Sequence, residues 1–219
     1  MTRSRSSRPA SKELSTKSNW VRAPGPVGPG LRIGLLGGSF NPPHAGHVHV
    51  SEAALKKLRL DYVWWLVSPQ NPLKPQKGMA SFAKRLEAAR HLANRRPRVI
   101  ATGIEADLGT RFTIDSLRAL KRRFPQTRFV WLMGSDNLVQ IPRWRRWQAI
   151  FSEVPVAVVA RPGSALSARQ SKAANRFRTA AHAADAAFSD TKPPAWTVIE
   201  VKRNPASGTR LRAQSASRS

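Results

Sequence analysis

The residues best suited to chemistry lie in one short segment, Gly37 to His47, with the sequence GGSFNPPHAGH. The paired glycines, Gly37 and Gly38, allow the backbone to turn sharply and to approach a ligand closely. His44 and His47 lie in or just before the first turn of the helix expected to follow, where unpaired amides and the helix dipole favour an anion. Their two imidazoles add hydrogen-bond donors for the same anion. The segment therefore predicts a phosphate-binding site at the start of a helix.

Several other kinds of site are excluded. The chain has no cysteine, which rules out disulfides, thiolate catalysis and Cys-ligated zinc. It has no GxxxxGK[ST] sequence, and the glycine segment is not GxGxxG either, so it is neither a Walker loop nor a dinucleotide fingerprint. His49 extends the pattern to HxxHxH, but His47 and His49 would face different sides of a helix. No metal site is expected from these histidines.

The elements around this segment alternate between strands and helices. Apolar runs predict strands, and apolar residues three to four positions apart predict helices. The expected strands cover 33–36, 62–67, 98–101, 128–133, 154–159 and 196–201, and the expected helices cover 46–59, 81–94, 113–123 and 142–150. Uniformly apolar strands that alternate with helices are typical of a parallel sheet covered on both faces. The expected fold class is α/β, a doubly wound parallel sheet that binds ligands beyond the carboxyl ends of its strands.

The length of 219 residues predicts one domain with appendages. Residues 1–30 are rich in Ser, Arg and Pro without a helical or strand period, and they predict a disordered basic tail. An Arg- and Ser-rich start also matches an organellar transit peptide, to which nothing else in the sequence points. The domain is expected over 31–212, with a frayed end at 213–219. Residues 164–195 are Ala-rich and leave a helix plus a loose connection as one interpretation.

The formal net charge of +26 predicts anionic partners. Nucleic acid, anionic lipid and phosphorylated small molecules all fit such a charge. No basic stretch interleaved with aromatic residues indicates a nucleic-acid module, and no apolar run approaches the roughly 18 residues of a membrane span. We therefore expect phosphorylated small molecules as partners, with no specific nucleic acid and no membrane. The absence of cysteine fits a cytoplasmic location, and the sequence does not reveal the oligomeric state.

Six further motifs follow the histidine segment along the chain. They are Asn71 to Lys74 (NPLK), Phe112 to Leu117 (FTIDSL), Gly134 to Asp136 (GSD), Trp144 to Trp147 (WRRW), Arg161 to Gly163 (RPG) and Ser207 to Arg212 (SGTRLR). Together with HxGH, their order and spacing resemble the nicotinate/nicotinamide mononucleotide adenylyltransferase family, in its bacterial nicotinate-nucleotide form. The resemblance covers about residues 31–212 and implies a Rossmann-like nucleotidyltransferase domain.

The resemblance also implies a reaction. AMP passes from ATP to nicotinate mononucleotide, giving nicotinate adenine dinucleotide and pyrophosphate. The attacking phosphate is already an anion at neutral pH, which agrees with the absence of a Ser/His/Asp set or a carboxylate pair. Mg²⁺ is the implied cofactor, bound to ATP oxygens mainly through water and phosphate. The same reaction on nicotinamide mononucleotide, phosphopantetheine or a flavin stays open as the alternative, whereas an aminoacyl-tRNA synthetase of this length would lack its KMSKS loop and anticodon domain.

The resemblance assigns a role to each matching residue. His47 and His44 are the expected catalytic residues, and they bind the ATP phosphates. The expected contacts to ATP come from Gly38, Ser39, Phe40, Lys74, Gly134, Asp136, Ser207, Thr209 and Arg212. The expected contacts to nicotinate mononucleotide come from Asn41, Arg85, Thr113, Trp144 and Arg161.

Some of these residues have a plainer interpretation. Asp136 alone would serve as a helix cap, Trp144 as core packing and Arg85 as a solvated helix charge. Trp147 is expected in the core rather than at a ligand. Five further tryptophans, including Trp64, Trp65 and Trp131, are expected to serve packing or to be incidental. Two positions depart from the family pattern, with Phe112 in place of a common Tyr and Gly208 in place of a common second Ser.

Overall fold

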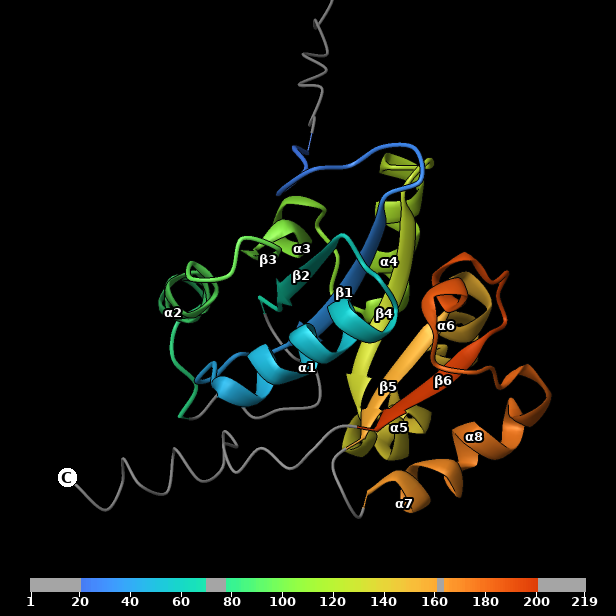
Figure 1. The fold of residues 1–219 in the computed structure, drawn as a ribbon. Coiled ribbons are helices and arrows are strands. Elements are labelled where there is room, and N and C mark those ends of the chain that lie inside the picture. The colour runs from blue at the N-terminus through green and yellow to red at the C-terminus, as the bar shows by residue number, and fades with distance from the viewer. Residues whose placement is uncertain (1–20, 70–77, 161–163, 201–219) are drawn as a thin grey trace, which may run out of the picture.

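The computed structural model describes residues 21–69, 78–160 and 164–200. Within these ranges six parallel strands form one sheet in the order β3-β2-β1-β4-β5-β6 (Figure 1). The strands are β1 (Arg32–Gly38), β2 (Tyr62–Val67), β3 (Val99–Thr102), β4 (Arg128–Gly134), β5 (Val156–Ala160) and β6 (Trp196–Glu200). The predicted α/β class and doubly wound parallel sheet are thus confirmed. The strand order reverses between β1 and β4, the place where such sheets bind ligands.

Helices cover both faces of the sheet (Figure 1). One face packs against α1 (Ala45–Lys57) and α2 (Phe82–Ala93). The other face packs against α3 (Ile104–Asp107), α4 (Thr113–Arg123), α5 (Ser135–Gln140), α6 (Trp147–Glu153), α7 (Ala165–Arg169) and α8 (Lys172–Arg176). Three short 3₁₀ turns complete the described elements, η1 (Ile141–Arg143), η2 (Arg178–Ala180) and η3 (Ala186–Asp190). None of the helices in the described ranges is long and apolar enough to cross a membrane.

The tryptophans of the strands divide between the two cores. Successive side chains of a strand point to opposite faces of the sheet. Trp64 therefore joins the core under α4, while its neighbour Trp65 joins the core under α1, and both are fully buried. Trp131 also belongs to the first of these cores. The expectation that these three residues pack in the core is confirmed.

The prediction of a single helix over 142–150 is wrong. The chain instead forms α5, the turn η1 and then α6, which begins only at Trp147. Trp144 has an extended backbone (ψ 147°), and Arg146 has a left-handed φ of 49°, so no helix can run through these residues. This break takes Trp144 out of helical register and brings its ring against Trp131 on β4, with 6.4 Å between ring centroids.

Part of the predicted tail packs on the domain. Val21, Ala23 and Val27 lie against the core that includes α4. The Arg123 side chain donates a hydrogen bond to the main-chain oxygen of Val21, and the main-chain N–H of Gly28 donates to the Thr127 hydroxyl. The described stretch 21–30 therefore contacts the domain. The division into 1–30, 31–212 and 213–219 stays a prediction.

Candidate functional site

The predicted site residues of the described chain gather at the carboxyl edge of the sheet. β1 ends at Gly38 and leads through Ser39 and Phe40 into α1. Its neighbour β4 ends at Gly134 and leads into α5, whose first turn contains Asp136. The remaining predicted residues lie outside the described residues; they are Lys74, Arg161, Ser207, Thr209 and Arg212. Their roles stay predictions.

His44 and His47 cap the first turn of α1 reciprocally. The main-chain N–H of Gly46 donates to His44 Nδ1, and the main-chain N–H of His44 donates to His47 Nδ1, both at 3.1 Å. The two ring centroids lie 4.0 Å apart. Two amides that a helix start would leave unpaired thus find acceptors, in the manner of a capping box made of imidazoles.

These hydrogen bonds assign the position of the imidazole protons. A ring nitrogen that accepts from an amide carries no proton of its own, so each neutral imidazole is protonated at Nε2. Nε2 is the ring nitrogen farther from the main chain. The cap therefore presents two N–H donors next to the positive end of the α1 dipole, an arrangement suited to an anion.

An aromatic cluster holds the first turn of α1. The Phe40 ring is buried and packs between His47 and Trp65, with centroid distances of 4.6 and 5.3 Å. The Ser51 hydroxyl donates to the main-chain oxygen of His47 at 2.9 Å and accepts from Trp65 Nε1 at 2.8 Å. Because β2 supplies Trp65, the sheet itself fixes the orientation of the first turn of α1.

Arg85 of α2 is buried below this turn. Its side chain is 3 % exposed, so the interpretation as a solvated helix charge is wrong. The guanidinium donates to the main-chain oxygens of Ser39, Ser68, Pro69 and Ala80 at distances between 2.6 and 3.0 Å. Burial lowers the pKa of this guanidinium, although an arginine remains charged at neutral pH. A contact between Arg85 and nicotinate mononucleotide stays a prediction.

Asn41 also ties two segments together. Its side-chain Oδ1 accepts from the main-chain N–H of Ala80 at 3.2 Å. Asn41 and Arg85 thus hold the same residue, Ala80, from its amide and its carbonyl sides. The predicted contact of Asn41 with the mononucleotide is not tested by these bonds.

Thr113 begins α4, and a buried carboxyl group lies behind it. Phe112, the N-cap residue, makes no side-chain hydrogen bond to the helix start. One turn further on, the Ser116 hydroxyl donates to Glu105 Oε1 at 2.6 Å and lies 2.9 Å from the Thr110 hydroxyl. Burial raises the pKa of the Glu105 carboxyl to about 7, against the opposing effect of the Ser116 hydrogen bond. Sequence reasoning missed Glu105, because a four-residue helix is too short to show a period.

Trp144 and Phe112 are both partly buried against the core that includes α4. Arg145 places its Cζ atom 4.7 Å from the centroid of the Phe112 ring, within the range of a cation–π contact. Trp147 is buried with its ring edge-on to Phe151, which confirms its expected place in the core. Because the chain breaks between η1 and α6, the two tryptophans differ in burial. Trp147 is a buried member of the core, whereas Trp144 is only partly buried against it.

Gly134, where β4 meets α5, lies close to the Asp136 carboxylate. A Cβ atom there would come within 2.5 Å of Asp136 Oδ1. The carboxylate therefore lies directly over the end of β4, and Asp136 is exposed. This position suits a contact with a ligand beyond the strand ends. The N-cap residue of α5 is Gly134, and Asp136 lies two residues further on, in the first turn of the helix.

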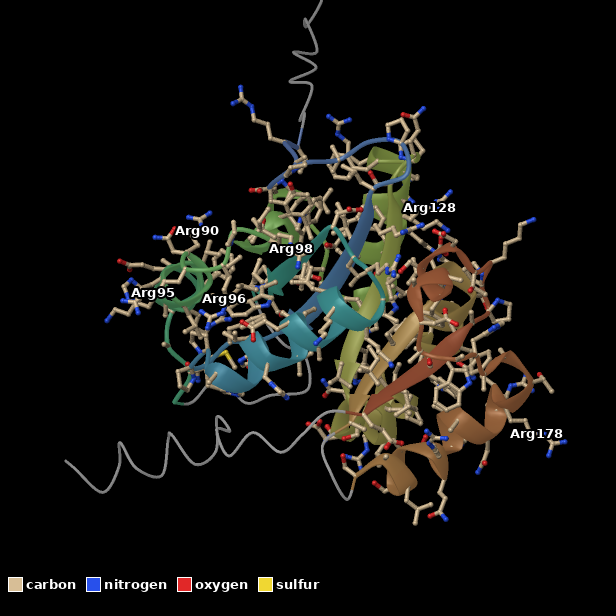
Figure 2. The ribbon with its side chains drawn as sticks, in the orientation of Figure 1. Arg90, Arg95, Arg96, Arg98, Arg128 and Arg178 are labelled. Carbon is tan, nitrogen blue, oxygen red and sulfur yellow. The ribbon has the colours of Figure 1, made fainter. Side chains whose placement is uncertain are left out.

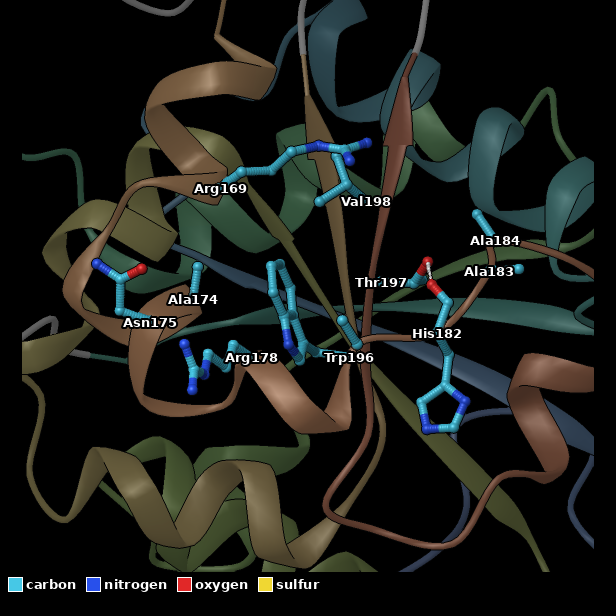
Figure 3. Close-up of a pocket in the computed structure, with 11 residues that line it drawn as sticks. Arg169, Ala174, Asn175, Arg178, His182, Ala183, Ala184, Trp196, Thr197 and Val198 are labelled. Atoms are coloured by element: carbon cyan, nitrogen blue, oxygen red, sulfur yellow. Dashed lines mark hydrogen bonds between the residues drawn. The ribbon is translucent and has the colours of Figure 1, made fainter.

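A cavity of about 410 Å³ lies elsewhere, beside the edge strand β6 (Figure 3). Its lining residues are Arg169, Ala174, Asn175, Arg178, Ala181, His182, Ala183, Ala184, Trp196, Thr197 and Val198. None of the predicted site residues is among them. Within the described ranges no three His, Asp or Glu side chains gather as a metal site. Of the arginines labelled in Figure 2, four lie on α2 or in the loop between α2 and β3, and two lie apart from them, Arg128 and Arg178.

Comparison with known proteins places the chain among nucleotidyltransferases. The family model described as cytidylyltransferase-like matches residues 35–214. A protein from Cereibacter sphaeroides (strain ATCC 17023) is 54 % identical over 183 residues, which cover 83 % of this chain and 96 % of that protein. One from Parvibaculum lavamentivorans is 61 % identical over 150 residues, covering 68 % and 74 %. Both have the curated name "Probable nicotinate-nucleotide adenylyltransferase".

Solved structures agree on the fold. The nicotinic acid mononucleotide adenylyltransferase of Plasmodium falciparum, complexed with NaAD, matches with a TM-score of 0.62. The match covers 84 % of this chain and 83 % of that one. The same enzyme complexed with APC matches with a TM-score of 0.59. At 17 % identity, these likenesses concern the fold alone.

Proposed function

We infer the function from one premise, that the chain belongs to the cytidylyltransferase-like family and, within it, to the nicotinate-nucleotide adenylyltransferases. The protein transfers AMP from ATP to nicotinate mononucleotide, and it produces nicotinate adenine dinucleotide and pyrophosphate. The structural observation that supports this function is the reciprocal cap of His44 and His47, after the carboxyl end of β1, where the strand order reverses between β1 and β4. It lies within the residues that the family model matches.

The chemistry requires positioning and charge stabilisation. The phosphate of nicotinate mononucleotide attacks the α-phosphorus of ATP, and pyrophosphate leaves in line. The nucleophile is an anion at neutral pH, so the protein need not remove a proton from it or form a covalent intermediate. Fixed donors directed at the phosphates then supply most of the rate enhancement.

The donors at the start of α1 are assigned to ATP. We propose that His47 Nε2 donates to the phosphate oxygen on which charge develops, and that His44 Nε2 donates to a neighbouring phosphate oxygen. The main-chain N–H groups of Gly38, Ser39 and Phe40 would contact the phosphate at the point of transfer. Gly134 and Asp136 would meet the adenosine ribose, since a carboxylate after a parallel strand binds ribose hydroxyls in related sheets.

The start of α4 is assigned to nicotinate mononucleotide. The main-chain N–H of Thr113 would donate to the nicotinate carboxylate, which favours a helix N-terminus. Trp144 would stack on the pyridine ring, and Asn41 would contact the same nucleotide. Five further contacts are proposed from the sequence alone. Arg161 would contact the mononucleotide, and the ATP phosphates would be held by Lys74, Ser207, Thr209 and Arg212.

A nucleotidyltransferase of this kind generally uses a divalent cation with ATP, and we propose Mg²⁺. The described residues offer no set of three carboxylate or imidazole ligands, and Asp136 is the one acidic residue assigned to the site. Mg²⁺ is therefore proposed to arrive with ATP, held by phosphate oxygens and water. It would neutralise charge on the triphosphate when bound.

Small molecules are the partners that this site supports. ATP and nicotinate mononucleotide are anions, so the positive charge of the protein does not require a specific nucleic acid as partner. A cytoplasmic location stays a prediction from the sequence. The alternative substrate is nicotinamide mononucleotide, which differs at the pyridine carboxylate. Pyrophosphate release should be measured with ATP and each mononucleotide in turn. We expect the higher kcat/KM with nicotinate mononucleotide, and no release with either would refute the function.

A further inference from the structure

We propose that Arg85 is a positioning residue for adenylyl transfer, acting through the Ser39–Phe40 peptide; this inference rests on the proposed function. Arg85 is nearly fully buried, and its Nη1 atom donates to the main-chain oxygen of Ser39 at 2.6 Å. It therefore reaches the loop that joins β1 to α1, which contains the proposed contacts to the reacting phosphate.

Peptide geometry connects this hydrogen bond to the site. The Ser39–Phe40 peptide is trans, and in a planar trans peptide the C=O and the following N–H point in opposite directions. When Arg85 holds the Ser39 oxygen, the Phe40 N–H must point away from the guanidinium. This N–H is one of the three main-chain donors proposed at the point of transfer. Arg85 thus orients a donor that it does not touch.

The Ser39–Phe40 peptide adjoins a strained residue, so it would change its orientation if nothing held it. Phe40 has a left-handed φ of 47°, a conformation that costs a non-glycine residue about 1 kcal/mol or more. Its ring is 1 % exposed and packs on Trp65, which fixes the side chain but not the preceding carbonyl. The Arg85 hydrogen bond supplies the restraint on that carbonyl.

Arg85 also fixes the loop against its surroundings. Besides Ser39, it donates to the oxygens of Ser68 at 2.8 Å and Pro69 at 3.0 Å after β2, and to the oxygen of Ala80 at 3.0 Å before α2. No carboxylate pairs with it among the described ion pairs. Its acceptors are main-chain carbonyls from three segments, so its contacts specify backbone positions.

A lysine could not make the same set of contacts. The guanidinium is a planar fork whose five N–H groups point in fixed directions, whereas an ammonium is a single point of charge. Carbonyl groups that lie on different sides of the side chain can be bound together only by N–H groups that point in different fixed directions, as those of a guanidinium do. We therefore expect Arg85→Lys to retain the charge and much of the stability and still to lose the orientation of the peptide.

The test compares steady-state kinetics of Arg85→Ala, Arg85→Lys and wild type with ATP and nicotinate mononucleotide. Misdirecting one donor to a developing charge costs about 10²-fold in kcat. We expect a fall of that order for Arg85→Ala and for Arg85→Lys, with both KM values nearly unchanged. Millimolar guanidinium should restore part of the kcat of Arg85→Ala. Arg90→Ala is the matched control, because Arg90 is an exposed arginine of the same helix.

Each other outcome overturns the inference. A raised KM for nicotinate mononucleotide with unchanged kcat would make Arg85 a direct substrate ligand. Unchanged kinetics in a folded variant would give it no role in catalysis. Should Arg85→Ala not fold, Arg85→Lys decides by the same criteria. A wild-type protein that releases no pyrophosphate would refute the proposed function, and the positioning role with it, whereas an active wild type with unaffected variants refutes the positioning role alone.

Discussion

The two nitrogens of His47 are expected to do different things, and substitution can separate them. Nδ1 accepts from the main-chain N–H of His44 and stabilises the helix start, whereas Nε2 is the proposed donor to ATP. Asparagine has its oxygen near the position of Nδ1, and glutamine has its amide near the position of Nε2. His47→Asn should keep the cap and lose the donor, and His47→Gln should do the reverse.

The expected magnitudes differ enough to be measured. Loss of one donor to a developing oxyanion lowers kcat by about 10² to 10³. Loss of one capping hydrogen bond costs about 1 kcal/mol, which lowers the Tm of a domain of this size by about 2–4 °C. His47→Asn should therefore show the large fall in kcat with a Tm close to wild type. His47→Gln should show the lower Tm and retain more of the turnover, and His47→Ala should show both losses.

The assay is pyrophosphate release for turnover and thermal unfolding for stability. His91→Ala serves as a control, because His91 is an exposed histidine of α2. If His47→Asn turned over at the wild-type rate, the assignment of Nε2 as the phosphate donor would be refuted. If His47→Gln unfolded at the wild-type temperature, the cap would not contribute to stability.

Two further predictions concern the start of α4. Removing the ring in Trp144→Ala should raise the KM for nicotinate mononucleotide roughly fivefold, as expected for about 1 kcal/mol of aromatic stacking, and leave the KM for ATP unchanged. A restored KM in Trp144→Phe supports stacking, and equal effects on both substrates contradict it. The pKa of Glu105 is raised from about 4.5 to about 7, so its contribution to stability is present below pH 4.5 and lost as the pH rises through 7. Glu105→Gln keeps an acceptor for Ser116 without the charge, and its stability relative to wild type should increase between these pH values in denaturant unfolding; parallel pH profiles would contradict this.

The elements that were predicted well are those with strong local patterns. The run YVWWLV predicts β2 at 62–67, and the structure has Tyr62–Val67. The helix expected over 113–123 is α4 at Thr113–Arg123, followed by Pro125, which disfavours continuation of a helix. Apolar residues on the buried side of a strand or helix recur with the period of that element, so the sequence alone can reveal them.

The parts that were missed depend on contacts distant in sequence. Arg85 occupies a position on α2 that its polarity would assign to solvent, and only the carbonyls of Ser39 and Ser68, 46 and 17 residues away, explain its burial. Glu105 is explained by Ser116, 11 residues away on another helix. A pattern within one element cannot reveal a buried polar residue whose partners come from others.

The choice of imidazoles as caps connects stability to function. Aspartate is among the best N-cap residues, and its carboxylate would satisfy the same amides as His44. A carboxylate at this place would also put a negative charge where a triphosphate has to bind. The described first turn of α1 contains no acidic residue, so the positive end of its dipole is left for the ligand. Neutral imidazoles satisfy the helix start without repelling ATP, and they add two donors of their own. The cap therefore lets the same turn be stable without ligand and remain able to bind an anion.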